Sequence, residues 1–129
     1  MASEMSTYLQ DKVVNLSLRN TAYTAPTTVY VGLFTTSLTA GGSGTEVSGG
    51  SYARVSATFT ASSSGATASN ADITFPTATA SWGTVTTIGV YDALTTGNLL
   101  YFTPLDVNKT IDSGDIFKIT SGNLTVSLA

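Results

Sequence analysis

The sequence predicts an all-β protein: an antiparallel β-sandwich, jelly-roll-like or immunoglobulin-like, of about seven or eight strands with one short N-terminal helix. Ser and Thr supply about 40 of the 129 residues, whereas charged residues make up only 10%, and threonine favours strands. Short apolar runs alternate with polar, glycine-containing turn segments. We expect a single domain over residues 1–129, with a helix and connector at 1–25 and the sandwich at 26–129.

The helix is predicted near residues 6–19. Ser6 is a suitable N-cap, and Leu9, Val13 and Leu16 then fall on one face at i, i+4 and i+7. Arg19 lies in the expected last turn. In the connector that follows, Pro26 ends any helical tendency, because proline fixes its own φ and disfavours helical geometry before it.

Between Pro26 and Pro76 the sequence predicts three strands separated by loops. Residues 28–35 are apolar on both faces, as in a fully buried strand. A long glycine-rich loop is expected at 37–51 and a second polar loop at 61–69. Residues 71–76 are expected to form a short strand ended by Pro76. The alternation in 52–60 predicts a strand with Arg54 facing outward. Its four inward side chains are Ala53, Val55, Ala57 and Phe59.

The second half of the chain contains the predicted core hairpin. The stretch around Trp82 and Gly83 begins a strand that ends near Tyr91, and a turn at 92–98 leads into a strand at 99–105. We expect Trp82 to fill the core, with glycine letting the backbone pass close to the ring. The alternative is a sugar-stacking surface of Trp82, Tyr91 and Tyr101. Further strands are expected at 116–120 and 123–128.

Composition excludes several classes of function. The absence of Cys and His removes disulfides, thiolate catalysis and the commonest general base and metal ligands, so no catalytic residue, cofactor or metal is predicted. A net charge of −3 argues against nucleic-acid binding, and no segment reaches the about 18 apolar residues of a membrane span. Asp112 and Asp115 fit a tight turn better than half of a calcium site, although ion binding stays open.

The expected contact elements are the helix, the glycine-rich loop at 41–51 and Arg54. The expected interaction residues are those of the helix together with Glu46, Tyr52 and Arg54. A single arginine beside a tyrosine can reach across an interface as a planar anchor. The alternative for Arg54 is an ordinary solvated side chain paired with Glu46. The helix residues in this prediction are Leu9, Val13, Leu16 and Arg19.

Nearly the whole chain resembles a family of virion structural proteins that is widespread in tailed bacteriophages and prophages. The most specific pieces are Glu46–Arg54 (EVSGGSYAR) and the stretch from Trp82 to Leu100. Members are generally labelled tail fibre or virion proteins without enzymatic activity. The resemblance implies a virion component, made in the host bacterial cytoplasm.

Three functions follow from this resemblance and the composition. The favoured one is a capsid decoration, or cement, protein that binds the major capsid protein as a homo-oligomer, with a trimer expected, because the chain lacks a repetitive fibre shaft. The alternative is a small tail component (fibre, tip or receptor-binding adaptor) that contacts other tail proteins. Its exposed aromatic candidates are Tyr8, Tyr23, Tyr30, Tyr52, Tyr91 and Tyr101. A remote alternative is a carbohydrate-binding or polysaccharide-degrading domain that depends on two carboxylates.

Overall fold

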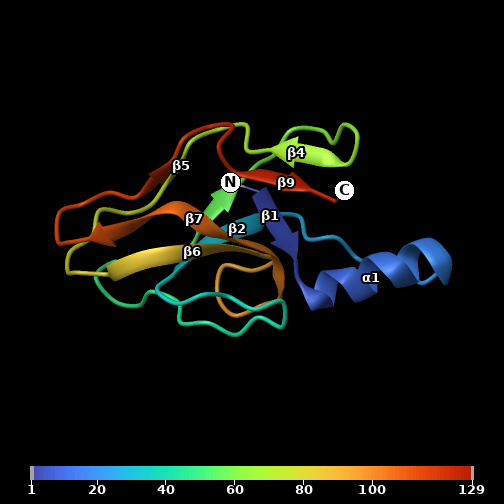
Figure 1. Cartoon of the computed structure of the whole chain (residues 1–129), viewed down its shortest axis with the longest axis horizontal. Helices are drawn as coiled ribbons and strands as arrows, with labels where there is room; N and C mark the ends of the chain where they lie inside the picture. The colour runs from blue at the N-terminus through green and yellow to red at the C-terminus, as the bar shows by residue number, and fades with distance from the viewer. Residues whose placement is uncertain (1, 129) are drawn as a thin grey trace.

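The computed structural model describes residues 2–128 and confirms an all-β fold with one short helix (Figure 1). The elements, in order, are β1 (Ala2–Met5), α1 (Thr7–Leu18), β2 (Val29–Phe34), β3 (Val55–Ala57), β4 (Ala66–Ala68), β5 (Ile73–Thr74), β6 (Gly83–Tyr91), β7 (Leu99–Ile111), β8 (Lys118–Ile119) and β9 (Thr125–Ser127).

The strands form one long sheet of order β3-β2-β6-β7-β1-β9-β4 and a small sheet of β5 and β8. The β6–β7 pair is its longest ladder, with β2 antiparallel on the other side of β6. β1 changes partner along its length: Glu4 and Met5 pair with β7, whereas residues 2 and 3 pair with β9. The chain therefore turns a corner at β1, and β9 and β4 lie opposite β2 and β6.

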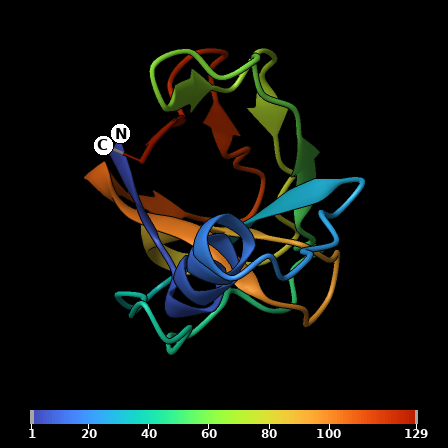
Figure 2. The same cartoon turned by 90° about the vertical axis from the view of Figure 1, so that its right-hand side faces the viewer.

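The main core lies between these two layers, and Figure 2 shows the chain wrapping around the space that its side chains fill. Val31, Leu33 and Ile88 contribute from the β2–β6 layer, and Phe75 and Leu124 contribute from the opposite side. A second, smaller cluster covers the other face of the β2–β6–β7 layer, which we call the outer face. Its members are Phe34, Leu38, Tyr91, Leu99 and Phe102.

Two strands were missed by the sequence analysis, and one pairing is parallel. β1 precedes the helix, where we expected only the helix and its connector, and β4 falls in a segment that we expected to be a polar loop. The parallel β1–β9 pair joins the two ends of the described chain (Figure 1). The N-terminal segment therefore belongs to the sheet rather than standing apart from the sandwich.

The helix begins and ends close to its predicted limits. Ser6 caps α1: its hydroxyl oxygen accepts from the Leu9 amide at 3.2 Å and donates to the Leu99 carbonyl. Arg19 is the C-cap rather than a residue of the last turn, and Asn20 adopts a left-handed φ of 51° that ends the helix. Ser6 thus ties the helix to β7 as well as capping it.

The predicted core hairpin is confirmed, with a different role for its glycine. Trp82 and Tyr91 are buried, and Trp82 donates through Nε1 to the Gly50 carbonyl at 2.9 Å. The backbone that passes close to the indole belongs to Gly50, where a Cβ would lie 2.8 Å from Nε1. Gly83 instead provides a φ of +81°, which an L side chain rarely adopts.

Candidate interaction site

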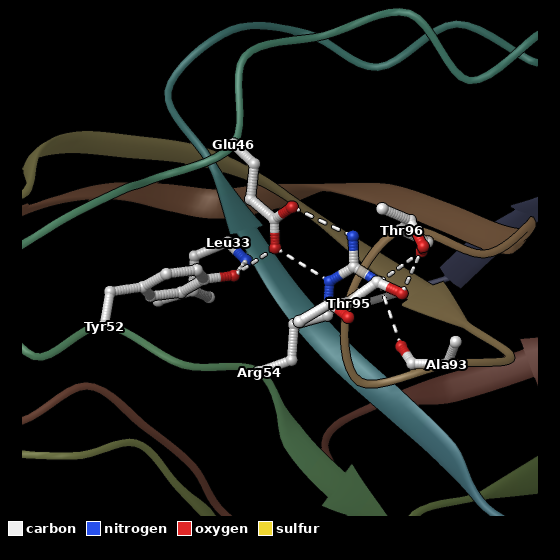
Figure 3. A network of polar contacts seen from close by, with 7 residues as sticks. All are labelled: Leu33, Glu46, Tyr52, Arg54, Ala93, Thr95 and Thr96. Carbon is white, nitrogen blue, oxygen red and sulfur yellow. Dashed lines mark hydrogen bonds and ion pairs between the residues drawn. The ribbon is translucent and has the colours of Figure 1, made fainter.

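A network of polar contacts lies on the outer face of β2 and is centred on Arg54 (Figure 3). The Arg54 guanidinium donates to both carboxylate oxygens of Glu46, at 2.8 and 2.9 Å. Tyr52 donates to the same carboxylate at 2.6 Å and accepts from the Leu33 amide at 2.9 Å. Gly32 leaves room for the network, since a Cβ there would lie 2.8 Å from Glu46 Oε2.

The same arginine holds the loop that connects β6 to β7. Arg54 Nη1 donates to the carbonyls of Ala93 and Thr96 at 2.9 and 2.8 Å, and its guanidinium lies 3.8 Å from the centre of the Tyr91 ring. Only 9% of Arg54 is exposed. One side chain therefore joins the glycine-rich loop that carries Glu46 to a loop about 40 residues further along the chain.

The β6–β7 loop is further fixed by its own hydrogen bonds. The Asp92 carboxylate accepts from the Asn98 backbone and side-chain amides at 2.7 and 3.0 Å. Thr96 and Gly97 both adopt positive φ, at 54° and 76°. These contacts present Leu94, half of whose surface is exposed, from a loop with a defined backbone. We call residues 92–98 the presented loop.

The electrostatics of the network follow from its burial and its hydrogen bonds. Burial alone would raise the pKa of Glu46, but the hydrogen bonds from Arg54 and Tyr52 outweigh it and lower that pKa. Burial, and then the hydrogen bond to Glu46, raises the pKa of Tyr52 far above its usual value. Glu46 is therefore ionised and Tyr52 protonated at neutral pH, and both favour the arrangement observed.

A pocket of about 390 Å³ lies beside the presented loop. Its walls come from the start of α1, from the glycine-rich loop at Ala40–Gly42 and from Gly97–Leu99. Tyr8, Asp11 and Asn98 are among the polar residues that line it. The helix and the glycine-rich loop, two of the elements that the sequence suggested as contacts, therefore meet here, and the pocket can hold a polar side chain or another small hydroxylated group by hydrogen bonds.

Partly exposed tyrosines gather near this end of the molecule. Tyr23 lies in the connector after α1, and burial, followed by the proximity of Tyr8, Asp92 and Tyr101, raises its pKa. Tyr30 is also partly exposed, whereas Tyr91 is buried and Tyr52 belongs to the network. Four of the six aromatic candidates therefore remain accessible.

The predicted helix residues differ in exposure. Leu9 is buried against the sheet, Val13 is half-buried, and Leu16 and Arg19 are exposed. The helix runs beyond the edge of the sheet (Figure 1), and most residues of its far half are exposed. The predicted apolar face of the helix is therefore buried at its start and exposed to solvent at its end.

The predicted exposure of Arg54 and the predicted limits of its strand are both corrected. We expected the side chain to face outward from a strand over 52–60, but β3 covers only Val55–Ala57 and Arg54 is buried. Its pairing with Glu46 is confirmed, but the solvated alternative is wrong. Because four hydrogen bonds hold the guanidinium inside the chain, Arg54 serves to position the presented loop. The prediction that Ala53 faces the core is also wrong, because Ala53 is exposed.

The remaining sequence candidates are resolved by local geometry. Asp115 accepts from the Asp112 amide through Oδ2 at 2.9 Å and donates its own amide to the Asp112 carbonyl at 3.0 Å, which is a tight turn. Within residues 2–128 no three Asp or Glu side chains converge as metal ligands would. The helix among these residues is too short and too polar to cross a membrane.

The presented loop was missed as a site element because its contacts use backbone carbonyls. Ala93 and Thr96 carry no side-chain signal, and their partner is distant in sequence. The spacing of Asp92 and Asn98 around a Thr-Gly pair is the one local sign of a fixed turn.

The fold, together with the end of the molecule that carries the presented loop, defines a β-sandwich protein with a fixed loop beside a small polar pocket. A comparison with family models matches residues 4–127 to the family described as Podophage GP4 fiber I protein gp80. The chain belongs to this family and is a fibre-type virion structural protein of a tailed phage. Among curated proteins no relative matches.

Proposed function

We propose that the protein is a non-enzymatic structural subunit of the phage tail fibre, and that the presented loop and its pocket contact another tail protein. The family match over residues 4–127 supports a location in the tail, because the family is described by its fibre protein. It favours the tail component over the capsid decoration protein that the composition had suggested.

The geometry supports a contact role for the presented loop. Preformed loops bind with a smaller loss of conformational entropy than mobile ones, and Arg54 and Asp92 fix this loop from both sides. Leu94 offers an exposed apolar side chain at its surface, and the adjacent pocket accepts a polar group. An apolar contact beside polar groups is the composition expected of a protein–protein interface.

Two experiments test the proposal. Immunogold labelling of intact particles is expected to mark tails, and label confined to heads would contradict the placement. Phage that lack the wild-type copy are then complemented with Leu94→Asp or, as a matched control, with Leu128→Asp, which changes an equally exposed leucine elsewhere. We expect only the first to reduce incorporation into particles; equal incorporation would contradict the contact role of the loop.

A further inference from the structure

The far half of α1 exposes an apolar stripe on the side opposite to the sheet. Leu9 faces the sheet, and Asp11, Val14 and Leu18 lie about half a turn away at i, i+3 and i+7. Asp11 lies where this stripe borders the pocket beside the presented loop. Half of the Val14 surface and 79% of the Leu18 surface are exposed. A helix with apolar side chains on opposite sides is typical of one that is covered on both.

A groove of about 590 Å³ lies along the far half of β7. Ile111, Phe117 and Ile119 form its buried apolar floor, and Val107 and Ile116 are exposed at its margin, at 66% and 55%. Asp106, Lys109 and Lys118 also line it, and Lys118 forms an ion pair with Asp72 at 3.3 Å. The groove is thus apolar, and Lys109 is the cation of its lining that has no ion pair among the described residues.

The groove exists because β7 has a free edge there. β1 pairs with β7 only at Tyr101 and Phe102, and beyond them no described strand covers the outer edge of β7. The ladder with β6 is also interrupted, since Val85 pairs with Lys109 but Thr87 pairs with Pro104. The register therefore shifts within this part of the ladder, as it does at a β-bulge. Such an edge is normally covered in a finished assembly.

From these two surfaces we propose that copies of this protein associate head to tail, with the Asp11–Val14–Leu18 stripe of one copy lying in the β7 groove of the next. Figure 1 shows α1 at one end of the long axis and the far end of β7 at the other, so the same copy cannot join its own two surfaces. The contact joins two different surfaces and is therefore heterologous. Repeated contacts of this kind form a closed ring if the rotation between neighbouring copies closes, and an open filament if it does not.

Length and charge both favour a second copy as the occupant. A helix of 12 residues is about 18 Å long, and the strand from Leu105 to Ile111 extends over about 20 Å. Asp11 lies on the helix stripe and Lys109 on the groove rim, and neither forms an ion pair within residues 2–128. The contact pairs them while Val14 and Leu18 cover the apolar floor.

The interface is small, so the association is concentration-dependent. A single short helix in a groove buries on the order of 1,000 Å², the lower limit for a specific interface. We therefore expect sedimentation velocity of the purified full chain to show a sedimentation coefficient that rises between about 1 and 500 μM. A monomer throughout this range would overturn the proposal.

Complementation between two blocked variants distinguishes this contact from any symmetric dimer. Leu18→Asp blocks the helix stripe and Val107→Asp blocks the groove, whereas Leu128→Asp changes an exposed leucine outside both. We expect each blocked variant alone to stay monomeric and the control to associate like wild type. An equimolar mixture of the two blocked variants should form one-to-one dimers and nothing larger, because one intact helix and one intact groove remain. Association of either single variant, or no dimer in the mixture, would contradict it.

A charge exchange tests the register independently. Asp11→Lys and Lys109→Asp should each weaken association about two- to fivefold, and the double variant should restore it, because each contact then regains one pair of opposite charges. A double variant weaker than both singles would refute this pairing. All these measurements use purified protein and hold whether or not the chain is placed in the tail.

Discussion

Replacing Arg54 by Ala tests most sharply how the presented loop is held. The change removes two hydrogen bonds to Glu46, two to the carbonyls of Ala93 and Thr96, and the guanidinium over Tyr91. Breaking a buried ion pair costs about 3–5 kcal/mol. Because 26% of the Glu46 side chain is exposed, water screens the carboxylate left behind, and we expect a loss of about 2–4 kcal/mol.

For a chain of this length such a loss lowers the midpoint of thermal unfolding by about 10 °C. Urea unfolding gives the free energy directly, and hydrogen exchange at the Asn98 amide should rise, because the loop loses its anchor. Arg19→Ala is the matched control: this arginine is exposed, and its loss should change stability by less than about 0.5 kcal/mol. A double-mutant cycle with Glu46→Ala isolates the pair. A loss below about 1 kcal/mol for Arg54→Ala, or additive effects in the cycle, would refute the reasoning.

Three further predictions concern neighbouring contacts. The pKa of Glu46 is lowered in the fold, so its ionisation stabilises the protein at pH values above its ordinary pKa of 4.5. This stabilisation should be lost as the pH falls below 4.5 and through the lowered pKa of the folded state. Glu46→Gln should therefore reduce the pH dependence of urea unfolding in this range. Gly50→Ala should cost at least about 2 kcal/mol and shift Trp82 fluorescence, because the new Cβ meets the indole at 2.8 Å with φ at +57°; unchanged fluorescence and stability would contradict this. Ser6→Ala should cost about 1–2 kcal/mol in thermal unfolding, since it removes the helix cap and the bond to Leu99; a neutral effect would show that neither contact matters.

Local signals predicted those parts of the fold that depend on neighbours in sequence. The cap at Ser6 and the β6–β7 hairpin both arise within short stretches, so periodicity and turn residues were sufficient. β1 could not be predicted in this way, because Ala2–Met5 becomes a strand only through pairing with β7 and β9, about 100 residues away. Tertiary pairing there overrides a weak local preference.

The candidate site was predicted only as a set of segments. Arg54 and Glu46 were paired correctly in one of the alternatives, since a lone arginine that follows a glycine-rich loop with one acidic residue suggests it. The burial of Arg54 depends on two distant carbonyls and on the missing side chain at Gly32. Neither leaves a pattern in sequence, and the same holds for the β7 groove, which exists because β1 stops short of it.

The measurement that tests the tail placement most directly is quantitative mass spectrometry of heads and tails separated from purified particles. We predict that this chain is recovered with the tails, at a small fraction of the copy number of the major capsid protein. Recovery with the heads, at a copy number close to that of the capsid protein, would contradict the tail placement and make the protein a capsid decoration subunit.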